Sequence, residues 1–208
     1  MQPKKTKLAL ACGALCLGVS GASIADTFNL TVNTIGDVTI LQEVQMDFGE
    51  NITTDASGSC AMNIATPPAA TLLTDTVLVF TGTNYGDLTG ANCVGVLGTP
   101  GVYSITGEAG LDVTITLTDE VQAGGDYTFT PAGSAVIYDG GALGDTIGSL
   151  AVNTPTASVT LADVTGGDLG GVIDGETRFA VGGTIAVGAT GLTSDTDYIA
   201  TFNVNVIY

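Results

Sequence analysis

The chain has 208 residues, which suits a single domain and is too short for two well-packed ones. It contains no histidine and no tryptophan, and 21 acidic residues face only four basic ones, giving a formal net charge of −17. Such a surface repels nucleic-acid phosphates and anionic lipid headgroups, so it disfavours nucleic-acid binding and electrostatic docking to membranes. Apolar residues still make up 45% of the chain, which is typical of a folded protein rather than a disordered acidic one.

The first 25 residues have the pattern of a secretory signal peptide. Lys4, Lys5 and Lys7 precede an apolar run over residues 8–19, and small residues follow, with Ser23 and Ala25 at the positions that signal peptidase reads. The apolar run is shorter than the roughly 20 residues that span a bilayer. We therefore predict cleavage after Ala25, export through the periplasm, and no membrane insertion of the mature chain.

The mature chain, residues 26–208, has few of the side chains that catalysis uses. Arg178 is its only basic residue against 21 acids, so its net charge is −20. Histidine and lysine, the usual general bases after pKa tuning, are absent. Two carboxylates could in principle run a glycosidase-like mechanism, but no spacing singles out a pair. The composition predicts a protein that is not an enzyme and carries no cofactor.

Apolar residues alternate with polar or small ones along most of the mature chain, and glycines separate the alternating runs. This period of two places one face of each strand toward a core and the other toward water. It predicts an all-β, antiparallel β-sandwich spanning residues 26–208 as one domain. In chain order, the clearest runs are Phe28/Leu30/Val32, Val44/Met46/Phe48, Cys60/Met62/Ile64, Leu111/Val113/Ile115/Leu117, Phe179/Val181, Ile185/Val187 and Tyr198/Ala200/Phe202/Val204/Val206/Tyr208.

Two segments look like additions to this scaffold. Residues 51–99 contain both cysteines of the mature chain, and an even pair in an exported protein predicts a Cys60–Cys93 disulfide that staples an insertion. Residues 139–175 are rich in glycine and aspartate, which could suggest a calcium loop. Their spacing matches no calcium-loop motif, and aspartate and glycine are also favoured in solvated turns. We predict turns there and no metal site.

The two ends of the mature chain carry matching patterns. The final strand, predicted over residues 197–208, ends the chain without a polar tail, and its edge needs a neighbour. Residues 26–34 form a short extended segment in which Phe28, Leu30 and Val32 alternate. One chain's start could complete another chain's sheet. Pairing within the same molecule requires the same alternation, so the pattern leaves both arrangements open.

Several segments in this order and spacing resemble the bacterial DUF4402 domain family. The resemblance covers most of the mature chain and implies an exported, immunoglobulin-like β-sandwich similar to fimbrial subunits, some of which are assembled by a periplasmic chaperone and an outer-membrane usher. It implies that Phe202, Val204, Val206 and Tyr208 line an acceptor groove into which Phe28, Leu30 and Val32 insert. The segments are Met46–Gly49, Gly101–Gly107, Val113–Ile115, Phe129–Pro131, Phe179–Val187 and Tyr198–Tyr208.

Two functional hypotheses follow. The first is a structural cell-surface protein, a fimbrial or pilus-like subunit that polymerises head to tail by β-strand donation, with its own copies as partners. The alternative is a monomeric extracellular binding module, either a calcium-dependent adhesin or a carbohydrate binder. It would use the acidic loops and exposed tyrosines, namely Tyr85, Tyr103, Tyr127 and Tyr138.

Overall fold

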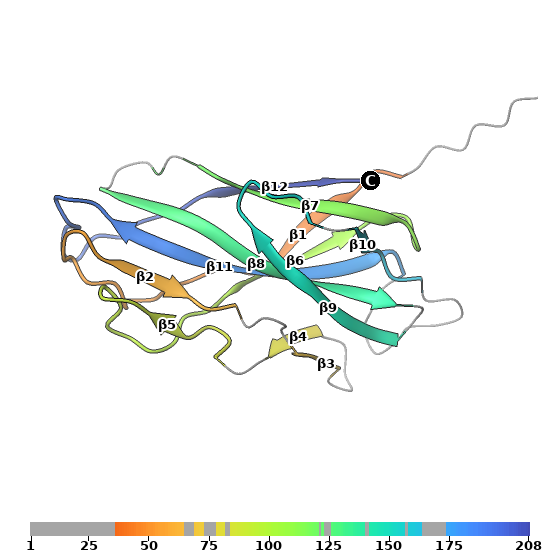
Figure 1. Cartoon of the computed structure of the whole chain (residues 1–208), viewed down its shortest axis with the longest axis horizontal. Helices are drawn as coiled ribbons and strands as arrows, with labels where there is room; N and C mark the ends of the chain where they lie inside the picture. Colours follow the sequence, from red (N-terminus) through yellow and green to blue (C-terminus); the bar gives the residue numbers. More distant parts are fainter. Residues whose placement is uncertain are drawn as a thin grey trace, which may run out of the picture. The chain divides into compact units, whose positions relative to one another are not determined.

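The prediction of an all-β fold is confirmed. The computed structural model describes residues 36–64, 69–72, 78–81, 84–120, 122, 126–139, 142–156, 158–163 and 174–208. In these residues the regular structure consists of strands without a helix, and every pairing between named strands is antiparallel (Figure 1). Arg178, Phe28 and other residues discussed above differ in this respect: Arg178 is described, whereas residues 1–35 lie outside the described part.

Twelve strands are present, with bounds that follow the chain. They are β1 Thr39–Val44, β2 Ser59–Met62, β3 Ala69–Leu72, β4 Leu78–Thr81, β5 Leu88–Thr89, β6 Gly101–Thr106, β7 Asp112–Asp119, β8 Tyr127–Asp139, β9 Ala142–Ala151, β10 Val159–Thr160, β11 Glu176–Val187 and β12 Phe202–Ile207.

The strands form one large sheet, a second sheet of three strands, and a separate β3–β4 pair. In the large sheet β11 is central: β6 and then β2 pair with one of its edges, and β8 pairs with the other. β1 lies beyond β6, β5 beyond β2, and β9 beyond β8. The second sheet has the order β10-β7-β12. Across the core, β7 and β10 contact β8.

The two sheets bury a shared apolar core because the alternation predicted from the sequence is real in most strands. On β7, the alternate residues Val113, Ile115 and Leu117 are buried, while the residues between them are not. They pack with Ile105 of β6 and Phe179 of β11 in one cluster. A second cluster nearby contains Phe48, Cys60, Met62, Leu88 and Phe129.

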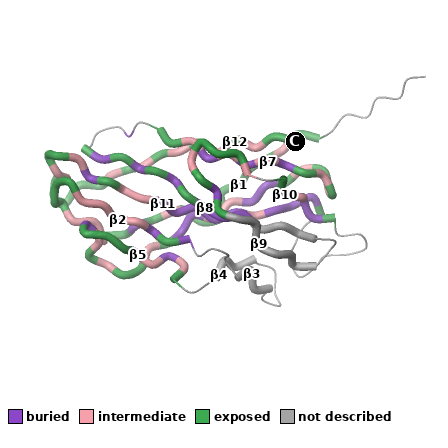
Figure 2. The backbone as a smooth tube through the Cα atoms, viewed as in Figure 1, coloured by how far each residue is buried: buried purple, intermediate pink, exposed green. Residues whose placement is uncertain are grey.

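β11 departs from the sequence prediction, which divided it into two short runs around Gly182 and Gly183. It is one continuous strand, and nearly all of it is buried (Figure 2). The glycines do not make a turn: a Cβ on Gly183 would lie 2.3 Å from the main-chain oxygen of Thr130 on β8. Glycine is required here because the neighbouring backbone comes very close and because φ is +144°.

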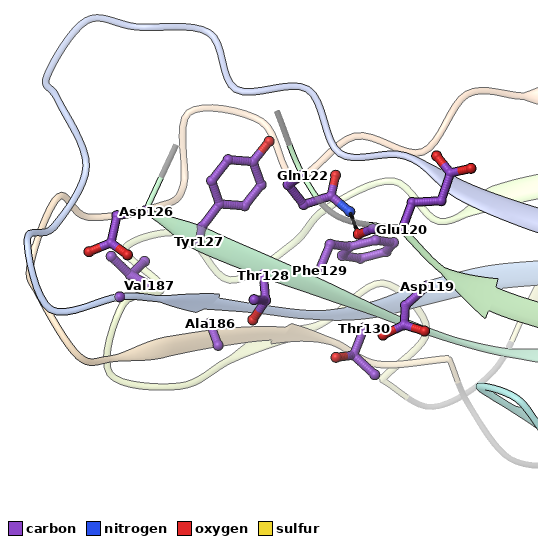
Figure 3. Close-up of a pocket in the computed structure, with 11 residues that line it drawn as sticks. Asp119, Glu120, Gln122, Asp126, Tyr127, Thr128, Phe129, Thr130, Ala186 and Val187 are labelled. Atoms are coloured by element: carbon purple, nitrogen blue, oxygen red, sulfur yellow. Dashed lines mark hydrogen bonds between the residues drawn. The ribbon is translucent and has the colours of Figure 1, made fainter. Parts of the chain in front are cut away.

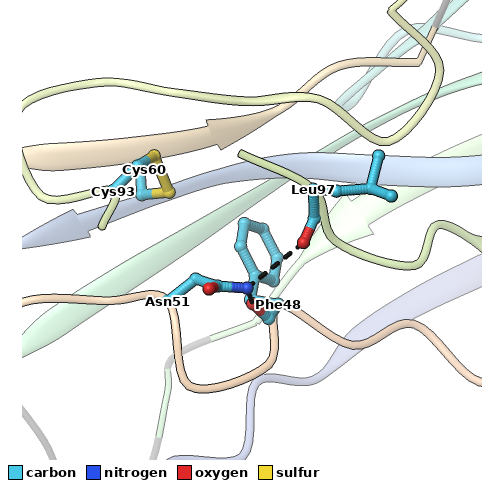
Figure 4. Close-up of a disulfide and its surroundings, with 5 residues drawn as sticks. All are labelled: Phe48, Asn51, Cys60, Cys93 and Leu97. Atoms are coloured by element: carbon cyan, nitrogen blue, oxygen red, sulfur yellow. Dashed lines mark hydrogen bonds between the residues drawn. A yellow bond between two sulfur atoms is a disulfide. The ribbon is translucent and has the colours of Figure 1, made fainter. Parts of the chain in front are cut away.

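The segment over residues 51–99, predicted to be an insertion, contributes β2 and β5 to the large sheet itself. The predicted Cys60–Cys93 disulfide is present, with the two Cα atoms 5.0 Å apart, and Cys60 is fully buried (Figure 4). Beside it, the Asn51 side-chain amide donates to the main-chain oxygens of Phe48 and Leu97, which ties the chain before β2 to the loop after β5. The disulfide therefore fastens part of the core rather than a peripheral addition.

The glycine-rich segment 139–175 likewise contributes to the sheets, since β9 and β10 lie within it. β9 pairs along much of β8 with two register shifts. Thr156, which follows β9, bonds to β7. The segment is therefore more than solvated turns.

Candidate functional site

The carboxyl-terminal strand β12 is shorter than predicted, and its apolar face lies on the core. It runs from Phe202 to Ile207 instead of covering residues 197–208. Phe202, Val204 and Val206 are half-buried and pack against the main cluster, whereas Asn203, Asn205 and Ile207 are exposed (Figure 2). The predicted alternation within the strand is therefore present in the structure.

The residues just before β12 are held by side chains instead of a strand ladder. The Gln122 amide donates to the Thr201 main-chain oxygen at 3.0 Å and accepts from the Thr201 N–H at 2.7 Å. The Tyr127 hydroxyl donates to the main-chain oxygen of Ile199 at 2.6 Å, and the Tyr127 ring packs edge-on against Tyr198. Tyr198 thus belongs to an aromatic pair at the approach to β12 and lies outside the strand itself.

The hydrogen bonds on the far side of β7 show which main-chain groups of β12 are free. Thr156 N–H donates to the oxygen of Ile115, the Ile115 N–H donates to the Thr156 hydroxyl, and Asn153 N–H donates to the oxygen of Leu117. Ile115 and Leu117 therefore direct their main-chain groups away from β12. Successive residues of a strand point their N–H and C=O groups to opposite edges.

It follows that the intervening threonines of β7 bond to β12. Their partners in the register are Asn203, Asn205 and Ile207. The N–H and C=O groups of Phe202, Val204 and Val206 must then point toward the other edge of β12. Among the described residues no strand lies along that edge. We call this edge, with these three residues, the acceptor edge.

Other strand edges in the described part carry features that discourage pairing. β5 and β10 have only two residues each, and β1 and β9 have register shifts in their pairing with β6 and β8. β1 also carries a charged residue, Glu43. Short strands, irregular pairing and charge are the usual protections of a sheet edge. The acceptor edge has six residues in regular register, with no charge, no proline and no bulge.

The core is also less covered on the side of the acceptor edge. Ile40 of β1 pairs with Ile105 of β6, so the two side chains lie on the same face of the sheet. Ile105 is fully buried, whereas Ile40 is 40% exposed. β12 lies over β6, with the rings of Phe202 and Tyr103 5.9 Å apart. A strand added along the acceptor edge would therefore lie over β1 and cover Ile40.

Tyr208, the remaining predicted acceptor residue, closes the far end of β12. Its hydroxyl accepts a hydrogen bond from the Glu108 N–H at 2.7 Å, and it lies close to Gly107, where a Cβ would be 2.4 Å from the hydroxyl oxygen. Its side chain is 41% exposed. Because Thr39 pairs with Thr106, the start of β1 lies at this same end.

The predicted donor residues Phe28, Leu30 and Val32, and the whole segment 26–34, lie outside the described residues. The described chain begins at Gly36, and Val38 already packs against the main core cluster.

The tyrosines suggested for a binding module are not exposed where they are described. Tyr103 stacks on Phe179 with ring centroids 5.1 Å apart, and burial raises its pKa. Tyr127 is buried, with a pKa raised by burial and by the neighbouring Tyr198. Burial raises the pKa of Tyr85 to about 12. The side chain of Tyr138 lies outside the described part. The expectation of exposed tyrosine ligands was wrong for Tyr85, Tyr103 and Tyr127.

An open cavity of about 590 Å³ lies next to the start of β12, lined by Asp119, Glu120, Asp126 and the buried Gln122 (Figure 3). The three carboxylates are spread across it and bond to different partners: Asp119 to Asn153, Glu120 to Asn203, and Asp126 to Thr190. The bonds from Thr190 lower the pKa of Asp126, which is fully exposed. These carboxylates do not converge as a catalytic pair does.

Within the described ranges no group of three or more potential ligands is placed to hold a metal ion. The same ranges contain no helix of the length and apolarity that a bilayer crossing requires.

No protein-family model, curated protein or solved structure matches this chain. The resemblance to the DUF4402 family therefore remains a prediction, and the functional argument depends on the geometry of the acceptor edge. Sequence reasoning identified the apolar face of β12 but missed Gln122. A glutamine between strands carries no local signal that it will pair with a main chain 79 residues away.

Proposed function

We propose that this protein is an exported structural subunit that polymerises by β-strand donation, and that the acceptor edge receives residues 26–34 of another copy. The observation that carries the proposal is the regular, uncharged edge of β12, with unpaired main-chain groups on the same three residues whose side chains face the core. Strand addition of this kind obtains affinity from main-chain hydrogen bonds and specificity from alternate side chains.

The donor segment fits the edge in length and in spacing. β12 has six residues, and the nine residues of 26–34 are enough to pair along all of it. Phe28, Leu30 and Val32 repeat every second residue, as do Phe202, Val204 and Val206. Residues directly opposite each other in a sheet lie on the same face, so the three donor side chains would enter the core region beside Ile40.

Pairing within one molecule would have a fixed direction. The start of β1 lies beside the end of β12, because Thr39 pairs with Thr106 and Tyr208 bonds to Glu108. A segment that leads into β1 and also lies along the acceptor edge of its own chain must therefore run parallel to β12. A segment from another copy has no such restriction and can run antiparallel, which is the more stable pairing. This favours donation between copies.

Donation in one direction leaves each subunit with a free edge for the next one. Such head-to-tail contacts do not close and generate fibres. Before assembly, the edge requires protection, and a chaperone strand could provide it, as the family resemblance implies. The localisation that goes with this proposal is export through the periplasm to a cell-surface fibre.

A disulfide trap tests the proposal in the mature protein. Leu30→Cys is combined in turn with Phe202→Cys, Val204→Cys or Val206→Cys, because residues bonded opposite each other have Cα atoms about 5.5 Å apart, within disulfide reach. Leu30→Cys with Asn205→Cys is the control, since Asn205 faces away from the core. Cys60 and Cys93 are already bonded to each other.

We expect at least one of the three pairs to give a ladder of covalent oligomers on a non-reducing gel, and the control pair to give none. A cross-linked monomer would show pairing within one chain and would overturn the proposal. Absence of any cross-link would overturn it as well. In parallel, deletion of residues 26–34 should leave a folded domain that forms no filaments in electron micrographs.

A further inference from the structure

The surfaces that meet when one subunit enters another are both acidic. After the donor segment, residues 34–38 lead into β1 of the incoming subunit. Five residues span at most about 17 Å. The body of the incoming subunit must therefore lie against the end of the acceptor from which this short linker emerges.

The end of the incoming subunit that carries the linker is surrounded by exposed carboxylates. Val38 enters the core there, next to Thr39 and Thr106. Gly107 bonds to Gly175, and Gly110 bonds to Leu161, which brings the loops of this end together. Their exposed acidic residues are Asp37, Glu108, Asp112, Asp163 and Asp174.

The acceptor presents carboxylates at either end of β12. At the start of the strand lie Asp119, Glu120 and Asp126, which line the open cavity. At the other end lies the same acidic group that surrounds Tyr208 and Glu108. The junction is acidic whichever way the donor strand runs.

Positive charge to balance these groups is lacking in the described part. Arg178 is the only basic residue of the mature chain, its side chain is 11% exposed, and it bonds to the nearly buried Glu176 at 2.5 Å. It lies on the central strand β11 and cannot reach a partner subunit.

We infer that strand donation in this protein is controlled by ionic strength, because the two acidic ends repel each other until salt screens them. This inference depends on the proposed function and describes the regulation of the same site. The Debye length is about 30 Å at 0.01 M salt and about 10 Å at 0.1 M. The linker limit of about 17 Å lies between these values. Repulsion across the junction should thus be strong at low salt and largely screened at high salt.

The test measures the rate of filament formation by the mature protein, using light scattering with electron microscopy, from about 10 to about 300 mM NaCl. We expect the rate to rise about tenfold or more over this range, as for other electrostatically controlled associations. The double variant Asp37→Asn/Glu108→Gln should assemble several-fold faster at low salt and show a weaker salt dependence.

The matched control is Glu50→Gln/Asp87→Asn, which removes the same charge. Asp87 precedes β5, on the opposite edge of the large sheet from β1, and Glu50 is adjacent to Asn51, which bonds to the loop after β5. The control should behave nearly like the unchanged protein. Filaments that form at one rate at all salt concentrations, or equal effects of the two double variants, would overturn this inference and leave strand donation intact. Absence of filaments at every salt concentration would refute the proposed function itself.

Discussion

Gln122 offers a sharp test of how the approach to β12 is held. Its amide donates to the main-chain oxygens of Glu120 at 2.6 Å and Thr201 at 3.0 Å, and its oxygen accepts from the Thr201 N–H at 2.7 Å. The side chain is only 9% exposed. It therefore replaces a strand neighbour for Thr201, immediately before the acceptor edge begins.

The size of its contribution follows from these three bonds. Each hydrogen bond contributes a net 0.5 to 1.5 kcal/mol, roughly, and a buried group left without a partner costs about 1–3 kcal/mol. The neighbouring cavity would let water reach some of the groups that lose Gln122. We expect Gln122→Met, which keeps the size of the side chain, to lower the free energy of unfolding by about 2–3 kcal/mol.

Gln122→Glu should add a pH dependence that Gln122→Met does not have. The introduced carboxyl would face the carbonyl oxygens of Glu120 and Thr201, to which only its protonated form can donate. Its pKa in the folded protein should thus lie above the unfolded value of about 4.3. The stabilising bond is present below the unfolded pKa and is lost as the pH rises through the folded pKa.

The assay is urea unfolding of the unchanged protein and both variants between pH 4 and pH 8, with each variant compared with the unchanged protein at the same pH. This comparison removes the titration of the 21 native acids. Gln122→Glu should be the more stable variant at pH 4 and no more stable than Gln122→Met at pH 8. A constant difference between the two variants across this range would refute the hydrogen-bonding role assigned to Gln122.

Three further predictions concern the fold. Reduction of Cys60–Cys93, with a sequence separation of 33, should lower the free energy of unfolding by about 3.5 to 4 kcal/mol, measured in urea with and without reductant; no change would show that the bond constrains little. Gly183→Ala should prevent folding or lower the melting temperature sharply, because its Cβ would meet a main-chain oxygen, whereas Gly36→Ala, with nothing within 4 Å, should behave as the unchanged protein in thermal melts. Tyr85 should ionise near pH 12 in an absorbance titration, and Tyr85→Phe should remove that step; since burial raises this pKa, the associated stability is present below pH 10 and is lost as the pH rises toward 12.

Local sequence pattern was sufficient where one face of a strand is buried and the other is wet. β7 and β2 show the expected alternation, and the disulfide followed from an even pair of cysteines in a chain with an export signal. The pattern failed for β11, where residues on both faces are buried and Gly182–Gly183 resembled a turn. Burial on both faces removes the period of two, so such a strand cannot be recognised from alternation alone.

The candidate site was predictable in its side chains and not in its main chain. Apolar residues at every second position placed Phe202, Val204 and Val206 on one face, as observed. Whether an edge is free depends on which other strands lie beside it. Here that is decided by β7, whose far edge bonds to Asn153 and Thr156. These are long-range pairings without a local sequence signal. The tyrosines were misplaced for a related reason, since a tyrosine beside a core packs its ring inward.

The geometry of β12 also explains why a donated strand must have a defined register. On the acceptor edge, the residues with free N–H and C=O groups are the same residues whose side chains face the core. A donor residue that bonds to Val204 lies directly opposite it and shares its face. With Leu30 in that place, the donor turns its apolar side chains inward. A slip by one residue would put Asn29 or Thr31 against the core and leave the apolar residues in water. Main-chain bonding and side-chain burial therefore select the same register.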